Sequence, residues 1–142
     1  MLKEGMGAPN FSLKCTNGNY HNLSEFLSSK VIIYFYPKDD TSGCTTEACG
    51  FRDDYKSIRN KNTIIIGISA DDNLSHQNFK QKYNLPFMLL SDTEYMVAKK
   101  YDALKRFLGF KLNKIKRITF LIDEKGKIIK IFPEVNASMH SK

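Results

Sequence analysis

The stretch VIIYFYPKDDTSGCTTEACGFRDDY, residues 31–55, decides how this chain of 142 residues is expected to fold. It opens with a continuous apolar run of β-branched and aromatic residues, Val31–Tyr36, which is typical of a strand covered on both faces. A polar loop follows, and beyond it apolar residues recur at helical spacing at Ala48, Phe51, Tyr55 and Ile58. The order of buried strand, loop and helix predicts the first half of a strand–helix–strand unit.

On both sides of this stretch the chain alternates between strand-like and helix-like segments. Further strands are expected at Thr63–Ser69, Phe87–Leu90, Arg117–Ile122 and Lys127–Phe132, and an N-terminal hairpin at Phe11–Lys14 and Tyr20–Leu23. Helices are expected at Thr45–Ile58, Asn73–Tyr83 and Glu94–Tyr101. This alternation predicts one α/β domain over residues 1–142, a sandwich with parallel central strands, antiparallel edges and flanking helices.

The net charge of +7 is concentrated in one part of the sequence. Residues 99–130 hold 11 Lys and Arg against 3 Asp and Glu, a net charge of +8. Such a segment can face nucleic acid, a membrane surface or an acidic partner. Because no recognition motif accompanies the charge, we expect a solvated surface, with neither nucleic acid nor membrane as a partner.

The composition also restricts the compartment. The apolar runs are too short to span a bilayer, and the first residues do not resemble a signal peptide. Three cysteines are an odd number and too few for a disulfide scaffold. A reducing compartment, the cytoplasm, is therefore expected, in which a pair of cysteines is more often catalytic than structural.

Cys44 is the candidate nucleophile. It follows the polar loop at the point where the next helix begins, with Thr45 or Thr46 as the expected N-cap and Glu47 in the first turn. Unpaired backbone N–H groups and the helix dipole at that end favour the thiolate, which is the reactive form of cysteine. Thr41 places a hydroxyl three residues upstream. Taken alone, the alternative is a small core residue.

Cys49 lies five residues beyond Cys44, in a C-x4-C arrangement. This is not the C-x-x-C spacing of dithiol oxidoreductases, and the three histidines show no ligand spacing that would accompany a zinc site. In an intact helix such residues have Cα atoms roughly 8–9 Å apart, whereas a disulfide needs less than about 7 Å. A bond between them would require the first helical turns to unwind. Cys15 is expected to be a bystander thiol.

These residues carry a resemblance. The segment Pro37-Lys38-Asp39-Asp40-Thr41-Ser42-Gly43-Cys44 matches the Pro-x-x-x-Thr-x-x-Cys motif of peroxiredoxins, and with Cys49 it resembles the bacterioferritin-comigratory-protein or peroxiredoxin Q branch. Further similarity lies at Gly7–Leu13, Leu90–Asp92 and Arg117–Asp123. Two departures are visible: Ser42 stands where the family commonly has proline, and the chain ends where the branch forms a C-terminal helix, which is expected to be short or truncated.

The resemblance implies a thioredoxin-like fold and a thiol-dependent peroxidase acting on hydrogen peroxide and organic hydroperoxides. Cys44 would be the peroxidatic cysteine and Cys49 the resolving one, joined in an intrachain disulfide that thioredoxin or a similar dithiol reduces. Arg117 would contact Cys44 and the peroxide, with Glu47 orienting it. Thr41 would hydrogen-bond the peroxide, and Pro37 would shield the sulfenic acid. No cofactor or metal is implied.

Three other functions compete with this one. A thioredoxin-like disulfide reductase would act without peroxide, but the chain lacks C-x-x-C. A nucleic-acid-binding module would use the basic segment, but no aromatic or zinc-finger signature supports it. A redox-switched holdase or thiol sensor would use the same two cysteines for signalling. The C-x4-C arrangement permits a complete cycle within one chain, so a monomer is expected.

Overall fold

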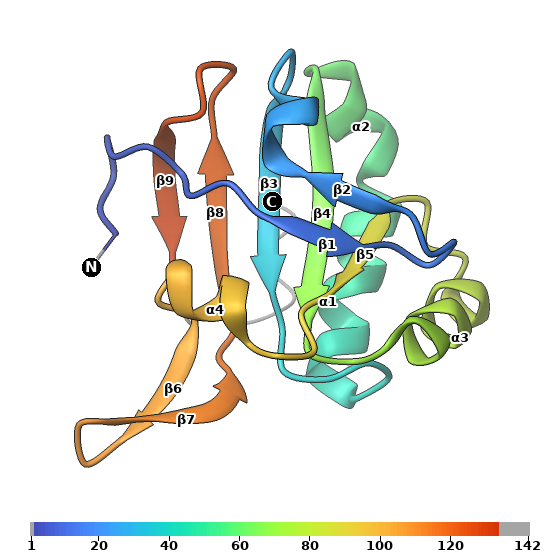
Figure 1. Cartoon of the computed structure of the whole chain (residues 1–142). Coiled ribbons are helices and arrows are strands. Elements are labelled where there is room, and N and C mark those ends of the chain that lie inside the picture. Colours follow the sequence, from blue (N-terminus) through green and yellow to red (C-terminus); the bar gives the residue numbers. More distant parts are fainter. Residues whose placement is uncertain (1, 134–142) are drawn as a thin grey trace.

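A twisted sheet of seven strands forms the centre of the molecule, in a computed structural model that describes residues 2–133 (Figure 1). The strand order is β2–β1–β5–β4–β3–β8–β9. Its strands are β1 (Ser12–Lys14), β2 (Tyr20–Asn22), β3 (Lys30–Phe35), β4 (Thr63–Ser69), β5 (Met88–Ser91), β8 (Ile118–Ile122) and β9 (Ile128–Phe132). The helical elements are η1 (Leu23–Phe26), α1 (Ser42–Asp53), α2 (Tyr55–Asn60), α3 (Asn73–Tyr83) and α4 (Met96–Lys100). This confirms the expected fold class.

Strand direction changes between the centre and the edges of the sheet. β3, β4 and β5 are parallel, because helices connect them and carry the chain back along the sheet. β8 pairs antiparallel with β3, and β9 with β8. In the β3–β8 register Phe35 lies opposite Ile118. Arg117, which precedes Ile118, is therefore brought to the end of β3 from which the loop to α1 departs.

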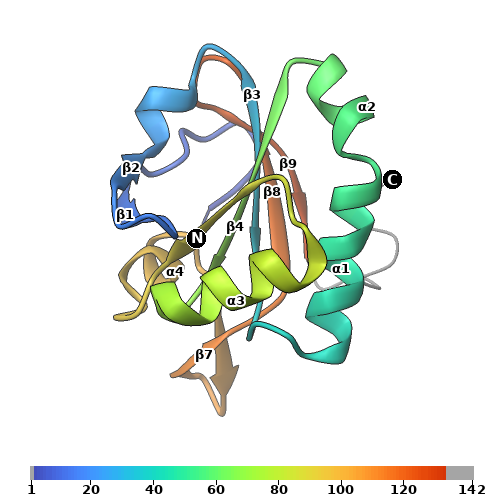
Figure 2. The same ribbon diagram turned by 90° about the vertical axis from the view of Figure 1, so that its right-hand side faces the viewer.

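The sheet separates two layers of core side chains. Side chains along β3 alternate: Val31, Ile33 and Phe35 pack on one face with Phe11, Leu13 and Phe120, while Tyr34 and Tyr36 pack on the other with Ala48, Phe51 and Phe87. α1 and α2 cover that second face, and the N-terminal strands lie on the opposite side (Figure 2). Cys44 belongs to the second layer, so the candidate nucleophile is part of the core.

The helix after the loop that follows β3 differs from its predicted form. It begins at Ser42 with Thr41 as the N-cap residue, whereas Thr45 or Thr46 was the predicted N-cap. It also breaks at Asp54, so the predicted single helix Thr45–Ile58 is two helices, α1 and α2. The last predicted helix is shorter than expected, because Tyr95 adopts a left-handed conformation with φ 61° and precedes the first helical residue.

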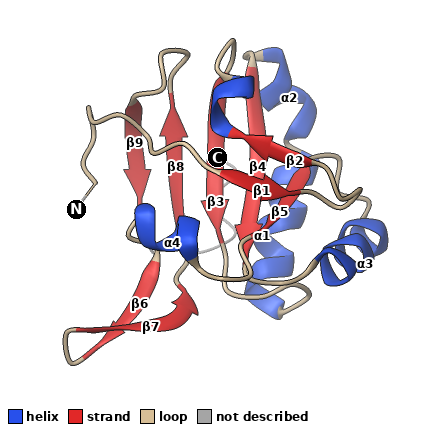
Figure 3. Cartoon of the chain, in the orientation of Figure 1, coloured by secondary structure: helices blue, strands red, loops and turns tan. Residues whose placement is uncertain are grey.

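A second, two-stranded sheet of β6 (Leu104–Phe107) and β7 (Phe110–Ile115) was not predicted from the sequence (Figure 3). The expectation about the C-terminal helix concerns residues 134–142, which lie outside the described residues. Within the described chain, every helix is too short or too polar to cross a membrane.

Candidate active site

Cys44 lies in the first turn of α1, close to the helix N-terminus. The N-cap residue Thr41 is extended, with φ −93° and ψ 158°, and its carbonyl accepts the first helical hydrogen bond from Thr45 N–H at 2.8 Å. The N–H groups of the residues between them therefore point out of the helix without intrahelical acceptors. The Thr41 hydroxyl donates to the Lys38 carbonyl at 2.9 Å and makes no capping bond. Thr41 thus closes the loop as well as starting the helix.

Arg117 connects Cys44 to Glu47. Its Nη2 lies 3.4 Å from Cys44 Sγ, and its Nη1 donates to Glu47 Oε1 at 2.7 Å. The Glu47 side chain is fully buried, and that of Arg117 is 16% exposed. A buried carboxylate needs such a partner, and the pairing fixes the guanidinium plane with one edge toward the sulfur. The structure thus brings together three predicted site residues that are up to 73 positions apart.

Gly43 makes this approach possible. A Cβ atom built on Gly43 would lie 2.9 Å from Arg117 Nη2. That is closer than side chains normally come, so any other residue at this position would press on the guanidinium. The absence of a side chain at Gly43 thus leaves room for the guanidinium beside Cys44.

The other two cysteines are free thiols. Cys49 is half-buried and lies with Cys44 inside the continuous helix α1. Cys15 is buried at the end of β1, where its Sγ contacts Asn17 Oδ1 at 2.7 Å. Pro37 is exposed at the start of the loop. With both thiols free, Cys49 is therefore held on the same helix as Cys44, the candidate nucleophile.

Asp39, which sequence reasoning did not single out, anchors the loop to the rest of the protein. Its Oδ2 lies 2.7 Å from His76 Nδ1 and accepts a bond from Ser75 at 2.8 Å, while its Oδ1 accepts from the Tyr36 hydroxyl at 2.6 Å. His76 Nε2 lies 3.0 Å from the Leu90 carbonyl. Since the Asp39 and His76 side chains are almost completely buried, the network ties the loop to α3 and β5. No local sequence signal marks a pair 37 residues apart.

Asp71 and Asp40 also help to hold the loop before α1 in place. Asp71 Oδ2 accepts the Asp39 N–H at 2.8 Å and the Ser69 hydroxyl at 2.7 Å. Possible ligand atoms of Asp39, Asp71 and His76 lie within 4.8 Å of one another, but hydrogen bonds already occupy them. Asp40 is exposed, and hydrogen bonds from Lys82 and Tyr83 hold the pKa of its carboxyl below the ordinary value. Both aspartates of the loop are thus held from α3.

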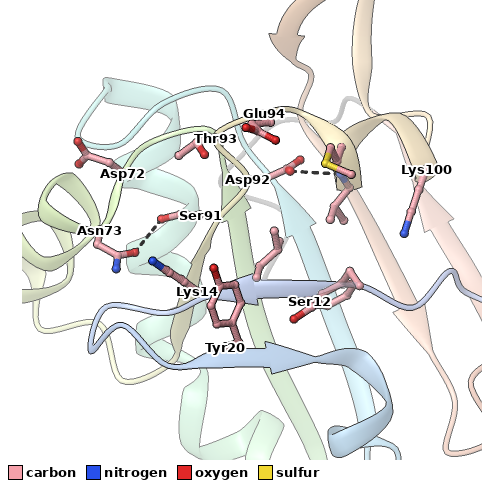
Figure 4. A pocket seen from close by; sticks show the side chains of 14 residues that line it. Ser12, Lys14, Tyr20, Asp72, Asn73, Ser91, Asp92, Thr93, Glu94 and Lys100 are labelled. Atoms are coloured by element: carbon pink, nitrogen blue, oxygen red, sulfur yellow. Dashed lines mark hydrogen bonds between the residues drawn. The ribbon is translucent and has the colours of Figure 1, made fainter.

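A cavity of about 720 Å³ lies away from this site, between the N-terminal hairpin, the start of α3 and α4 (Figure 4). Lys14, Tyr20, Asn73 and Ser91 point toward it, and none of the predicted site residues lines it. Asp92, on its wall, accepts hydrogen bonds from the N–H groups at the start of α4. The Asp92 carboxylate is therefore used within the fold.

Known proteins share both the sequence and the fold. Residues 5–131 match the AhpC/TSA family. The peroxiredoxin Bcp of Bacillus subtilis is 44% identical over 98% of this chain and 90% of its own length, and that of Escherichia coli is 40% identical with the same coverage.

Solved structures agree with these relatives. Peroxidoxin BcpB of Mycobacterium tuberculosis superimposes with a TM-score of 0.92 at 34% identity, covering 99% of this chain and 92% of the other. A bacterioferritin comigratory protein of Xanthomonas campestris, studied for alkyl peroxide reduction, gives a TM-score of 0.87 at 30% identity, covering 92% and 85%. The chain therefore belongs to the AhpC/TSA family and is a peroxiredoxin of its Bcp and peroxiredoxin Q branch.

Proposed function

We propose that this peroxiredoxin reduces hydrogen peroxide and organic hydroperoxides with Cys44 as the peroxidatic residue. The observation that carries the proposal is the 3.4 Å contact between Arg117 Nη2 and Cys44 Sγ at the N-terminus of α1. A thiol that is 1% exposed has little water to stabilise its anion. The guanidinium and the free N–H groups of the helix supply that stabilisation, and the thiolate is the nucleophile.

The reaction is a displacement at oxygen. The thiolate attacks one peroxide oxygen, so that an S–O bond forms while the O–O bond breaks, and the other oxygen leaves as hydroxide or alkoxide and takes up a proton. Two electrons pass from sulfur to the peroxide, and Cys44 becomes a sulfenic acid. Arg117 lies where it can hydrogen-bond both the sulfur and the departing oxygen, whose negative charge grows in the transition state.

The remaining loop residues assist this step. Glu47 positions Arg117 through the 2.7 Å bond. The Thr41 hydroxyl donates to Lys38, which leaves its oxygen able to accept a hydrogen bond from the O–H of the peroxide. Pro37 stands at the opening of the loop, where its ring shields the sulfenic acid from further oxidation.

Cys49 resolves the sulfenic acid. Its thiolate attacks Cys44 Sγ, the S–S bond forms, the S–O bond breaks, and the oxygen leaves as water after taking up a proton. Since both cysteines lie within α1, the helix must open between them before the sulfurs can meet. A thiol reductant, which we propose to be thioredoxin or a similar dithiol, then returns two electrons to the disulfide.

The positions of the two cysteines also bear on the oligomeric state and the compartment of the enzyme. Because both cysteines belong to one chain, a monomer can complete the cycle, and we propose a monomer acting in the cytoplasm, where thiols stay reduced. The family match spans residues 5–131, which supports one peroxiredoxin domain in this chain.

The test compares three cysteine variants in a coupled assay with thioredoxin, thioredoxin reductase and either hydrogen peroxide or an alkyl hydroperoxide. We expect Cys44→Ser to abolish peroxide consumption and Cys15→Ser, the matched control, to retain it. Cys49→Ser should consume about one equivalent of peroxide per chain and then stop. Peroxide turnover by Cys44→Ser would refute the proposal. Oxidation of the coupled system by a disulfide substrate added in place of peroxide would favour a disulfide reductase instead.

A further inference from the structure

The hairpin of β6 and β7 ends in an exposed apolar tip. Phe107 pairs with Phe110 across the turn, and Leu108 lies between them. All three side chains are exposed: Phe107 to 61%, Leu108 to 82% and Phe110 to 74%. Both ribbon views show this hairpin projecting beyond the body of the protein, at the end of the sheet from which the loop before α1 departs (Figures 1 and 2). Large apolar side chains gathered at a projecting apex indicate a contact surface.

Leu108 occupies the turn of the hairpin in a conformation that is unfavourable for leucine. Leu108 and Gly109 both have positive φ, 52° and 82°. A two-residue hairpin turn with this geometry strongly favours Asn-Gly, because leucine in the left-handed region is strained by about 1–2 kcal/mol. Folding alone would therefore favour asparagine at position 108. The leucine at the apex points to a role outside the fold.

The base of the hairpin is rigidly held. Leu104 and Ile115 face each other in the register, are 3% and 2% exposed, and belong to the main core cluster. Lys116 N–H also donates to the Ala103 carbonyl at 2.8 Å. The apex is thus presented on a fixed support, and Ile115 at the base of the hairpin lies two residues before Arg117, which contacts Cys44.

The charge of the hairpin indicates which kind of surface its tip contacts. Residues 104–115 carry four cations, Lys105, Arg106, Lys111 and Lys114, and no acidic residue. Arg106 pairs with Asp102 at 3.2 Å, while the three lysines make no salt bridge within residues 2–133. Two such hairpins would repel each other, which disfavours a second copy of this chain. A negatively charged surface with an apolar interior satisfies both the lysines and the aromatic tip.

We propose that the β6–β7 hairpin docks this protein on membrane surfaces that contain anionic lipids. Phe107, Leu108 and Phe110 enter the boundary between headgroups and acyl chains, and the lysines contact the headgroup phosphates. A convex apex enters a bilayer without a preformed groove, which favours lipid over an acidic protein. The sequence alone had indicated no membrane partner, because it could not show these side chains at one exposed apex.

The test measures binding of the full chain to vesicles of phosphatidylcholine, with and without phosphatidylglycerol, by co-sedimentation. We expect binding to the anionic vesicles, weakened by added salt. Leu108→Asn should lower the partition coefficient by about tenfold, since one buried leucine side chain is removed from the lipid. The same variant should unfold at an equal or higher temperature, because the turn is relieved. The matched control Leu74→Asn, at a leucine 64% exposed on α3, should leave binding unchanged.

A charge variant completes the design. Lys111→Glu with Lys114→Glu should abolish the preference for anionic vesicles, while hydrogen peroxide reactivity stays at the wild-type level in every hairpin variant. Unchanged binding by Leu108→Asn, or equal binding to neutral and anionic vesicles, would overturn the proposal. Self-association that depends on Leu108 would overturn it in favour of a second copy. The readout is binding, so it is independent of the proposed peroxidase chemistry.

Discussion

Asp39 and His76 share a single proton in the interior of the protein. Asp39 Oδ2 and His76 Nδ1 are 2.7 Å apart, and His76 Nε2 lies 3.0 Å from the Leu90 carbonyl. A carbonyl only accepts, so Nε2 carries a hydrogen, and one more proton must lie between the carboxylate and Nδ1. Burial raises the pKa of Tyr36 well above its ordinary value, so its hydroxyl remains a donor to Asp39.

Asp39→Asn preserves the geometry of this pair and removes the charge of the carboxylate. The asparagine amide can donate to Nδ1 of a neutral His76, so we expect near-wild-type reaction of Cys44 with hydrogen peroxide at neutral pH. The hydrogen bond between the two side chains is kept in the variant, and only the charge of the carboxylate is removed. Stopped-flow rates of the variant and the wild type, measured side by side at neutral pH, provide the comparison.

Asp39→Ala should slow the same reaction at every pH, because the loop loses its anchor. The control is Asp92→Ala, which removes a carboxylate that is also buried but serves α4. That variant should lower the unfolding temperature without changing the peroxide rate. A rate for Asp39→Asn as low as that of Asp39→Ala would contradict the expectation that an amide can replace the carboxylate in holding the loop.

Arg117→Lys should lower the rate of Cys44 oxidation by about 10²–10³-fold, because lysine cannot contact sulfur, Glu47 and the peroxide with one planar group. Glu47→Gln should have a smaller effect in the same direction, since the amide still accepts one bond from Arg117. Arg106→Lys, on the exposed hairpin, serves as the control. Single-turnover kinetics with peroxide in excess measure all three. Wild-type rates in Arg117→Lys would disprove the role given to the arginine.

Gly43→Ala should displace Arg117 from Cys44 by steric pressure alone, without changing any charge. We expect slower peroxide reduction, by about tenfold or more, with little change in helix stability, since alanine favours helix. Gly7→Ala provides the comparison, because a Cβ at that position meets no atom within 4 Å. The kinetics of both variants are measured beside their melting temperatures. Equal rates in the two would show that Arg117 can move aside freely.

Formation of the Cys44–Cys49 disulfide should open the first turns of α1. We expect amides of residues 44–52 to exchange faster with deuterium in the oxidised protein, because their helical hydrogen bonds must break. Cys49→Ser should show the reduced-state pattern after exposure to peroxide. Equal protection of the two states, with the disulfide mapped by mass spectrometry, would contradict the need for unwinding.

The sequence identifies strands well where burial is continuous. β3 and β4 are apolar along nearly their whole length, and their bounds agree closely with prediction. The β6–β7 hairpin was not predicted because only Leu104 and Ile115 at its base are buried, while its tip is apolar and exposed. For the site, Cys44 stands out through its local context. Arg117 was placed only by resemblance, and the Asp39–His76 contact depends on long-range packing that no local pattern reports.

The break between α1 and α2 at Asp54 sets a boundary for cooperative change. Asp54 N–H still donates to the Gly50 carbonyl at 3.2 Å, and Ile58 N–H donates to the Asp54 carbonyl at 3.0 Å, but no single helix runs through the residue. An opening that begins at Cys44 can therefore end at Asp54, and α2 keeps its place. We therefore expect the proposed redox cycle to be confined to a segment of about three turns, so that the sheet keeps its shape while the chain beside it changes form with every turnover.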